Sequence, residues 1–421
     1  MAKQAYHIGD AVHKQAVHHR SFEMLWETKW KAPCKAGIYP FMFGCTQDFE
    51  PVVHAIIKKG LKEPYNWDEY AQMFFPKAEE LSNIAANAEA AGEKEKASEY
   101  YLRSSALYRI ARFPIPRSQQ QRLAWTKGKE VFYKGASLLP NPILEVKIAH
   151  VHRLPHEGTT IPANFLLPAS ASATHRVPLV LILTGLDGYR TELAVWQQGF
   201  HDKGMATLVV EIPGTGDSPA DPRDPTSPDR VADSIFAALG NQPQVDTNKV
   251  LVWGFSTGGY YALRMAHTHA DKLAGAVSLG GGSHHMFDAE WLNVVDKMEY
   301  PFDLREALAV KFGYGEDVKR FVKEASGKFS LLEDGTLEKK CCRLLLVNGE
   351  EDEIFPIEDL WIVTGKEPEE EDGKKGVVIK GKKHMGEPDS FLVVLKWIHE
   401  LFGLDGDIHH HLKLLPTKVK Y

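Results

Sequence analysis

The sequence predicts an α/β fold with a separate helical region at its N-terminus. After about residue 140, short apolar runs alternate with helical stretches, which is typical of a mostly parallel sheet covered by helices on both faces. Before residue 140, apolar and small residues recur every three or four positions, which is the helical period. We therefore expect a helical domain over residues 1–140 and an α/β domain over residues 141–421.

Residues 74–110 carry the clearest helical pattern of the N-terminal region. Gly92 lies between two periodic runs, where a tight turn favours glycine. Pro114 and Pro116 follow the second run and cannot continue a helix. The segment therefore predicts an α-hairpin with small residues on its inner face.

The C-terminal region is expected to contain eight strands. Residues 143–151 and 160–167 are interpreted as an antiparallel pair, and the helical segments between the later strands predict parallel neighbours. The later strands are expected at residues 177–183, 206–211, 249–253, 275–279, 343–347 and 376–379. Residues 283–340 are too long for an ordinary connection between strands and are interpreted as a helical insertion.

The composition excludes several classes of function. The 421 residues are 43% apolar and 25% charged, as expected of a globular protein. Fifty Lys and Arg against fifty-six Asp and Glu give a net charge of −6 without a basic block, which argues against binding nucleic acid or an anionic membrane. The sequence shows no secretory signal, no membrane-spanning run and no CxxC pair, so we expect a cytoplasmic protein with reduced cysteines.

The strongest chemical signal is the G-x-S-x-G sequence over residues 254–258. It follows a predicted strand and precedes a helical run, which is the context of a nucleophile elbow. Ser256 is therefore the expected nucleophile, held on a turn for which the flanking glycines leave room. A glycine-rich turn without chemistry is the alternative interpretation.

A serine hydroxyl needs a base, and the base needs a carboxylate to orient it. His384 is the expected base because it follows the last strand and precedes the final helix. Asp352, three residues past Gly349, is the favoured acid, with Glu353 as the alternative. A solvated loop histidine is the alternative for His384.

An oxyanion hole requires two backbone N–H groups aimed at the developing charge. Thr257, directly after the nucleophile, is one expected donor, and Leu186 in the loop after residues 177–183 is the other. Asp187 either orients substrate or caps a turn. His284 follows the strand at residues 275–279, where it would lie at the mouth of a pocket.

Two groups of histidines raise the question of a metal. His284-His285 and residues 409–411 lack a carboxylate at helical spacing, and no H-E-x-x-H motif occurs. Solvated histidines are the favoured interpretation, so neither a metal nor a cofactor is expected.

The sequence resembles the α/β-hydrolase superfamily. Four segments carry this resemblance: the elbow, residues 184–188, the Gly349-x-x-Asp352 acid and residues 380–384. The helical pattern over residues 85–113 is similar to the group of the fermentation–respiration switch protein and 2,6-dihydropseudooxynicotine hydrolase. The sequence most resembles the fungal yellowish-green-type hydrolases, which shorten polyketides in melanin and other pigment pathways. The resemblance implies that the N-terminal helical domain is a lid that chooses the substrate, and that the protein forms a homodimer.

The function implied by this resemblance is hydrolysis of a carbon–carbon bond next to a ketone in a polyketide-like aromatic substrate. The candidate substrate contacts are Asp187, Tyr189, His284 and Tyr108. A carboxylesterase or thioesterase on the same scaffold is the first alternative. A non-catalytic regulatory binding protein with a hydrolase fold is the second.

Overall fold

The computed structural model describes residues 6–366, 373–404 and 420–421. Two compact units are present: one is drawn from Met1–Lys14 and Val146–Lys413, and the other from Gln15–Glu145 and Leu414–Tyr421. The first is called the α/β unit below, and the second the helical unit.

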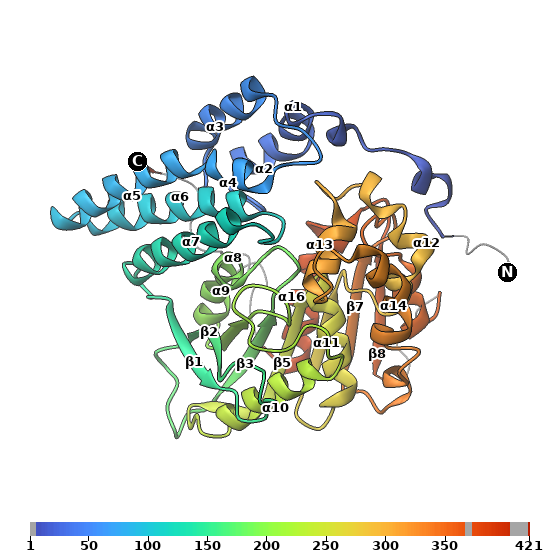
Figure 1. Cartoon of the computed structure of the whole chain (residues 1–421). Helices are drawn as coiled ribbons and strands as arrows, with labels where there is room; N and C mark the ends of the chain where they lie inside the picture. The colour runs from blue at the N-terminus through green and yellow to red at the C-terminus, as the bar shows by residue number, and fades with distance from the viewer. Residues whose placement is uncertain (1–5, 367–372, 405–419) are drawn as a thin grey trace. The chain divides into compact units, whose positions relative to one another are not determined.

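The α/β unit is built on a mixed sheet of eight strands among the described residues, in the order β1-β2-β4-β3-β5-β6-β7-β8 (Figure 1). Strand β2 runs antiparallel to β4, whereas the pairs from β4 through β3, β5, β6 and β7 to β8 are parallel. The strands are β1 Leu144–Ala149, β2 Thr160–Leu166, β3 Val177–Leu183, β4 Ala206–Val210, β5 Val245–Phe255, β6 Gly275–Leu279, β7 Leu344–Gly349 and β8 Lys374–Ile379. The predicted α/β class with a mostly parallel sheet is confirmed.

Helices cover both faces of this sheet because its central strands are apolar on both sides. Helix α11 packs on β5 and β6 and lies in front of the sheet in Figure 1, whereas α16 packs on β6 and β7 and lies behind it. The helices that connect the strands are α8 Arg190–Leu193, α9 Gln197–Asp202, α10 Ser227–Leu239, α11 Thr257–Thr268, α15 Glu358–Thr364 and α16 Asp389–Phe402.

The long connection between β6 and β7 carries short helices. It contains three 3-10 turns, at His285–Phe287, Val295–Lys297 and Thr336–Glu338. Its α-helices are α12 Ala289–Leu292, α13 Leu304–Lys311 and α14 Val318–Phe329.

The helical unit contains the expected α-hairpin. Helices α5, Phe75–Ala90, and α6, Lys94–Arg112, are joined at Gly92, whose φ of 80° suits glycine. Helix α7, Gln119–Ser137, packs closely on α6. Gly135 of α7 permits this approach, since a Cβ at that position would lie 2.9 Å from the carbonyl oxygen of Ser98. The shorter helices of this unit are α1 Phe22–Leu25, α2 Lys31–Ala36, α3 Thr46–Lys59 and α4 Trp67–Gln72.

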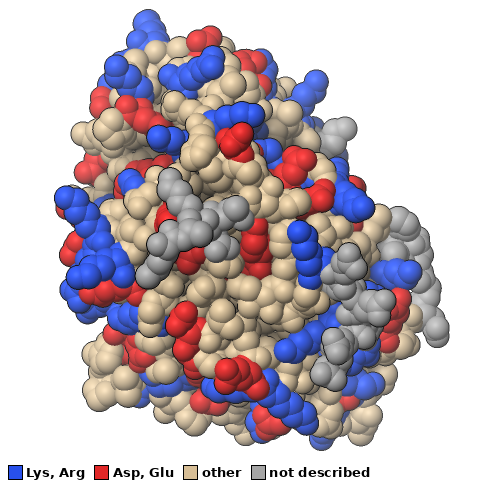
Figure 2. Space-filling model, turned by 90° about the vertical axis from the view of Figure 1, so that its right-hand side faces the viewer, with Lys and Arg blue, Asp and Glu red and all other residues tan. Residues whose placement is uncertain are grey.

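The charged side chains on the surface, and the hydropathy of the helices, can be compared with what the sequence indicated. On the face shown in Figure 2, acidic and basic side chains are interspersed. Within the described residues, we find no helix with the length and apolar character needed to cross a membrane.

A buried ion pair joins the loop after β3 to the end of β4. Nη1 of Arg190 donates to both carboxylate oxygens of Glu211 at 2.7 Å, and Nη2 donates to Asp217 at 2.8 Å. The side chains of Arg190 and Glu211 are both fully buried. Burial raises the pKa of Glu211, while the Arg190 charge opposes that rise. The pair fixes the position of the loop that precedes α8.

Replacing Arg190 with alanine is expected to lower the free energy of unfolding by about 3–5 kcal/mol, because Glu211 would remain buried without its cation. Urea denaturation followed by circular dichroism measures the loss. Arg320→Ala is the matched control, because its pair with Glu324 is exposed and screened by solvent, so its loss should change the free energy of unfolding very little. Equal losses for the two variants would contradict the prediction.

Candidate active site

The nucleophile elbow lies between β5 and α11. Ser256 has φ 53° and ψ −123°, a conformation that residues with a side chain rarely adopt. A Cβ added at Gly254 would lie 2.0 Å from the carbonyl oxygen of Gly258, and one added at Gly258 would lie 2.3 Å from that of Thr184. Both glycines of the motif are therefore required by close backbone packing, and the turn presents the hydroxyl of Ser256.

The structure brings the three residues of the expected triad together. Nε2 of His384 lies 2.8 Å from Oγ of Ser256, and Nδ1 of the same ring lies 2.8 Å from Oδ2 of Asp352. Ser256 follows β5, Asp352 follows β7 and His384 follows β8. Because these strands are parallel, their carboxyl ends meet at one edge of the sheet, which is where active sites of such sheets form.

The carboxylate of Asp352 is fully buried and satisfied by hydrogen bonds. Its Oδ1 accepts the N–H groups of Ile354 and Phe355 at 2.7 and 3.0 Å. Its Oδ2 accepts from Nδ2 of Asn348 at 2.7 Å. The alternative acid, Glu353, is instead ion-paired with Lys383. The geometry therefore favours Asp352 as the partner of His384.

Two residues that the sequence analysis did not single out hold the triad loops. Oδ1 of Asn348 accepts the N–H of Met385 at 2.9 Å, so this amide links the acid loop to the histidine loop. Oε1 of Glu299, a residue of the helical insertion, accepts the N–H of His384 at 3.1 Å and that of Glu353 at 3.4 Å. Glu299 is 5% exposed. No motif marks it, because it lies in an irregular segment.

The surroundings of His384 favour its protonated form. Burial lowers the pKa of His384, but the charge and hydrogen bond of Asp352, together with the charges of Glu299 and Glu387, raise the pKa above the ordinary value of 6.5. The carboxyl of Glu387 is exposed to solvent, which weakens its effect on His384. A positive charge on His384 is thus stabilised by the carboxylates of Asp352 and Glu299.

Glu299→Gln is expected to move the acid limb of the kcat/KM profile to lower pH. The base must be neutral, so kcat/KM falls as pH drops through the raised pKa of His384. Glutamine keeps an acceptor for both N–H groups but removes the charge that raises this pKa. The pH dependence of kcat/KM measures the shift.

Glu350→Gln is the matched control for this shift. Its carboxylate also contacts the histidine loop, at the N–H of Gly381, but it is about one third exposed. An unchanged acid limb in Glu299→Gln, or an equal shift in Glu350→Gln, would contradict the role of the Glu299 charge.

The two residues expected to donate backbone N–H groups to an oxyanion, Thr257 and Leu186, lie in segments next to Ser256. Thr257 is the first residue of α11, and an α-helix leaves its first N–H groups without an intrahelical acceptor. The loop that carries Leu186 approaches the elbow so closely that a Cβ added at Gly185 would lie 3.5 Å from Cβ of Ser256. The assignment of the Thr257 and Leu186 N–H groups as donors stays a prediction that agrees with this placement.

The candidate substrate contacts have the following places. Asp187 accepts a hydrogen bond from the hydroxyl of Tyr300 at 2.7 Å, and Tyr189 is buried at the start of α8. Nδ1 of His284 pairs with Oγ of Ser330 at 2.7 Å. Tyr108 belongs to the helical unit, where it is buried against Phe75. Their contacts with substrate stay predictions.

Comparison with known proteins identifies the family. The family described as Esterase FrsA-like matches residues 65–400. The chain belongs to the FrsA-like esterase family. The α/β-hydrolase group expected from the sequence is thereby confirmed, as is its enzyme class, the hydrolases.

Curated members and relatives are distant in sequence. Esterase FrsA of Pectobacterium atrosepticum is 24% identical over 277 residues, which are 65% of this chain and 63% of that esterase. The match thus spans less than two thirds of the bacterial protein. Hydrolase LUC6 of a Fusarium species is 27% identical over 339 residues, which are 72% of this chain and 77% of LUC6.

Solved structures share the fold. The crystal structure of 2,6-dihydroxy-pseudo-oxynicotine hydrolase superposes with a TM-score of 0.66 over 86% of this chain and 93% of that protein, at 19% identity. AbyA5 superposes with a TM-score of 0.61 over 78% of this chain and 89% of AbyA5, at 21% identity. At this identity the likeness establishes the fold alone.

Proposed function

We propose that this FrsA-like protein is a serine hydrolase that cleaves a carbon–carbon bond next to a ketone in a polyketide-like aromatic substrate. The observation that carries the proposal is the continuous hydrogen-bonded chain from Ser256 through His384 to Asp352, with 2.8 Å at each step. This arrangement is the one that activates a serine hydroxyl at neutral pH.

In the first step, Oγ of Ser256 attacks the ketone carbonyl and forms a tetrahedral intermediate. Nε2 of His384, at 2.8 Å, accepts the hydroxyl proton, and Asp352 stabilises the resulting imidazolium. The N–H groups of Thr257 and Leu186 hold the oxyanion.

In the second step, the bond between the carbonyl carbon and its neighbour breaks. The electron pair leaves on the neighbouring carbon, which a second carbonyl or an aromatic ring of the substrate stabilises as an enolate or phenolate. His384 returns its proton to that carbon, and the acyl group stays on Ser256. Water, activated by the same histidine, then releases a carboxylic acid and regenerates the hydroxyl.

The bond class rests on the resemblance of the sequence to the polyketide-shortening hydrolases, which accords with the similarity to a fungal hydrolase. A role of the helical unit in selecting the substrate, a part in pigment or melanin synthesis, and a homodimer belong to the same proposal. Ester hydrolysis is the second candidate, favoured by the esterase description of the family. The triad serves both reactions.

The test separates the two reactions with one preparation of the full chain. An aromatic 1,3-diketone of naphthopyrone type and a set of aryl esters are incubated with the protein, and products are identified by mass spectrometry. Release of a carboxylic acid and a shortened ketone supports the proposal, and Ser256→Ala is the control for background cleavage. Rapid ester turnover without ketone cleavage would replace the proposal with the second candidate.

A further inference from the structure

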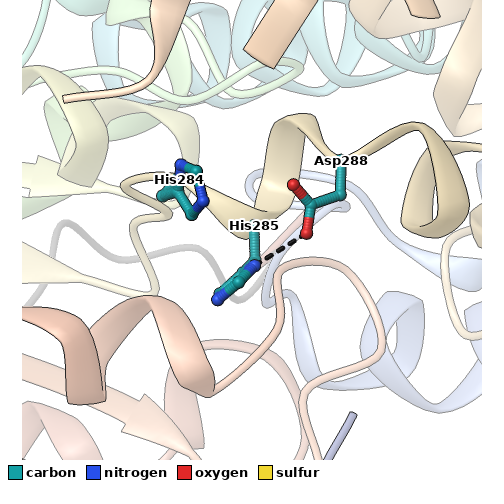
Figure 3. Close-up of side chains that lie close together, drawn as sticks. All are labelled: His284, His285 and Asp288. Carbon is teal, nitrogen blue, oxygen red and sulfur yellow. Dashed lines mark hydrogen bonds and ion pairs between the residues drawn. The ribbon is translucent and has the colours of Figure 1, made fainter. Parts of the chain in front are cut away.

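The loop after β6 gathers three potential metal ligands that the triad does not use. His284, His285 and Asp288 each offer a donor atom, and these atoms lie within 4.8 Å of one another (Figure 3). Nδ1 of His285 already lies 2.7 Å from Oδ2 of Asp288. All three side chains are half-buried. The expectation that these histidines lack a carboxylate at helical spacing was wrong, because Asp288 lies four residues after His284 and three after His285.

We propose that His284, His285 and Asp288 bind a divalent transition-metal ion, for which Zn²⁺ fits best. Two imidazoles and one carboxylate are a ligand set typical of Zn²⁺. Mg²⁺ and Ca²⁺ instead favour sites made of oxygen ligands alone. Bonds of about 2.0–2.1 Å to a tetrahedral Zn²⁺ place the donor atoms about 3.3 Å from one another, with water as the fourth ligand. The movement that this requires is small for side chains that are already neighbours.

The backbone of this loop is held from inside the protein. Oδ1 of Asp359 accepts the N–H groups of His284 and His285 at 2.8 and 2.6 Å, and Oδ2 accepts that of Met286 at 2.9 Å. Asp359 is 1% exposed and also accepts from the hydroxyl of Ser283. The ligands therefore project from a fixed turn, which reduces the entropy lost when they bind an ion.

The partner of His284 determines which of its nitrogens is left for a cation. Nδ1 pairs with Oγ of Ser330 at 2.7 Å, so Nε2 is the ring nitrogen available for the metal. A ligating histidine commonly uses its second nitrogen in this way to fix the ring orientation. This assignment competes with the substrate contact predicted for His284.

The charges around the loop favour a cation. Asp288 and Asp359 are both in hydrogen-bond contact with this loop, Asp288 through Nδ1 of His285 and Asp359 through the backbone N–H groups. The hydroxyl of Tyr6 donates to Oδ2 of Asp288 at 3.2 Å, so the N-terminal segment reaches the same carboxylate. A bound ion would neutralise this concentration of negative charge and stabilise the folded protein, because it binds only the native arrangement.

Calorimetric titration of the full chain with zinc chloride tests the proposal. The three histidines at 409–411 lie outside the described residues and are a second possible zinc-binding sequence, so they are first replaced by alanine. That background is expected to bind one equivalent of Zn²⁺ and to gain thermal stability from it. Adding His285→Ala is expected to abolish both effects.

Two further variants make the outcome decisive. Asp288→Asn keeps the shape of the side chain and is expected to lose the same equivalent, which covers the case in which His285→Ala fails to fold. His156→Ala is the matched control, because His156 forms an exposed pair with Asp221 at 3.3 Å. No zinc binding by the background, or undiminished binding by folded Asp288→Asn, would overturn the proposal. The visible spectrum of bound Co²⁺ provides an independent readout of tetrahedral nitrogen and oxygen ligation.

Discussion

Replacing Ser256 with alanine is expected to reduce kcat by about a million-fold, because the triad acts as a unit and its nucleophile is lost. In the wild type, Nε2 of His384 lies 2.8 Å from the hydroxyl of Ser256. Without that hydroxyl, the imidazole has no nucleophile to deprotonate. Single-turnover and steady-state assays on a cleavable substrate measure the loss. A phosphonate that labels serine nucleophiles should modify the wild type and leave this variant unlabelled.

The fold should survive this substitution. Alanine keeps the Cβ that already exists at φ 53°, so the backbone requirement of the turn does not change. The midpoint of urea unfolding is therefore expected to match that of the wild type. A variant that keeps more than about a tenth of the activity would show that another residue is the nucleophile.

Replacing Asp352 with asparagine is expected to lower kcat by about four orders of magnitude, the effect of supporting the wrong imidazole tautomer. Asp352 accepts from Nδ1 of His384, whereas an amide placed there would compete as a donor. The other oxygen would still accept the N–H groups of Ile354 and Phe355, but the new amide nitrogen would face Nδ2 of Asn348 as well as Nδ1 of His384, so urea unfolding must accompany the assay.

Glu353→Gln is the matched control for the acid. It removes the neighbouring carboxylate, whose partner is Lys383 rather than the imidazole. Its kcat is expected to stay within about ten-fold of the wild type. A larger loss in Glu353→Gln than in Asp352→Asn would assign the acid to Glu353.

The strands of the sheet could be predicted, as could the candidate residues that the structure brings together, because each strand and each motif carries its own local signal. The predicted strand at residues 177–183 has the same bounds as β3, and that at 275–279 has the same bounds as β6, since buried parallel strands are continuous apolar runs. The predicted strand at 249–253 was too short, because β5 begins at Val245 with a polar segment that carries no apolar signal.

The support around the triad could not be predicted, because it depends on contacts between distant segments. Glu299 binds the N–H of a histidine 85 residues away, and nothing in its own neighbourhood indicates this. Asn348 lies within β7, where its sequence position suggests a strand residue rather than a link to the histidine loop. Asp288 is different, because its place three residues after His285 was visible in the sequence and the 3-10 turn only completes the contact.

The backbone conformation of Ser256 lowers the stability of the fold at the position of the proposed nucleophile. At φ 53° and ψ −123° a glycine would relieve strain of about 1 kcal/mol or more, so the hydroxyl is retained at a position where its side chain is a burden to folding. Replacing this serine with glycine is expected to stabilise the fold, whereas alanine, which keeps the Cβ, is not. The conformation of one residue thus ties the hydroxyl of the proposed nucleophile to a cost in folding stability.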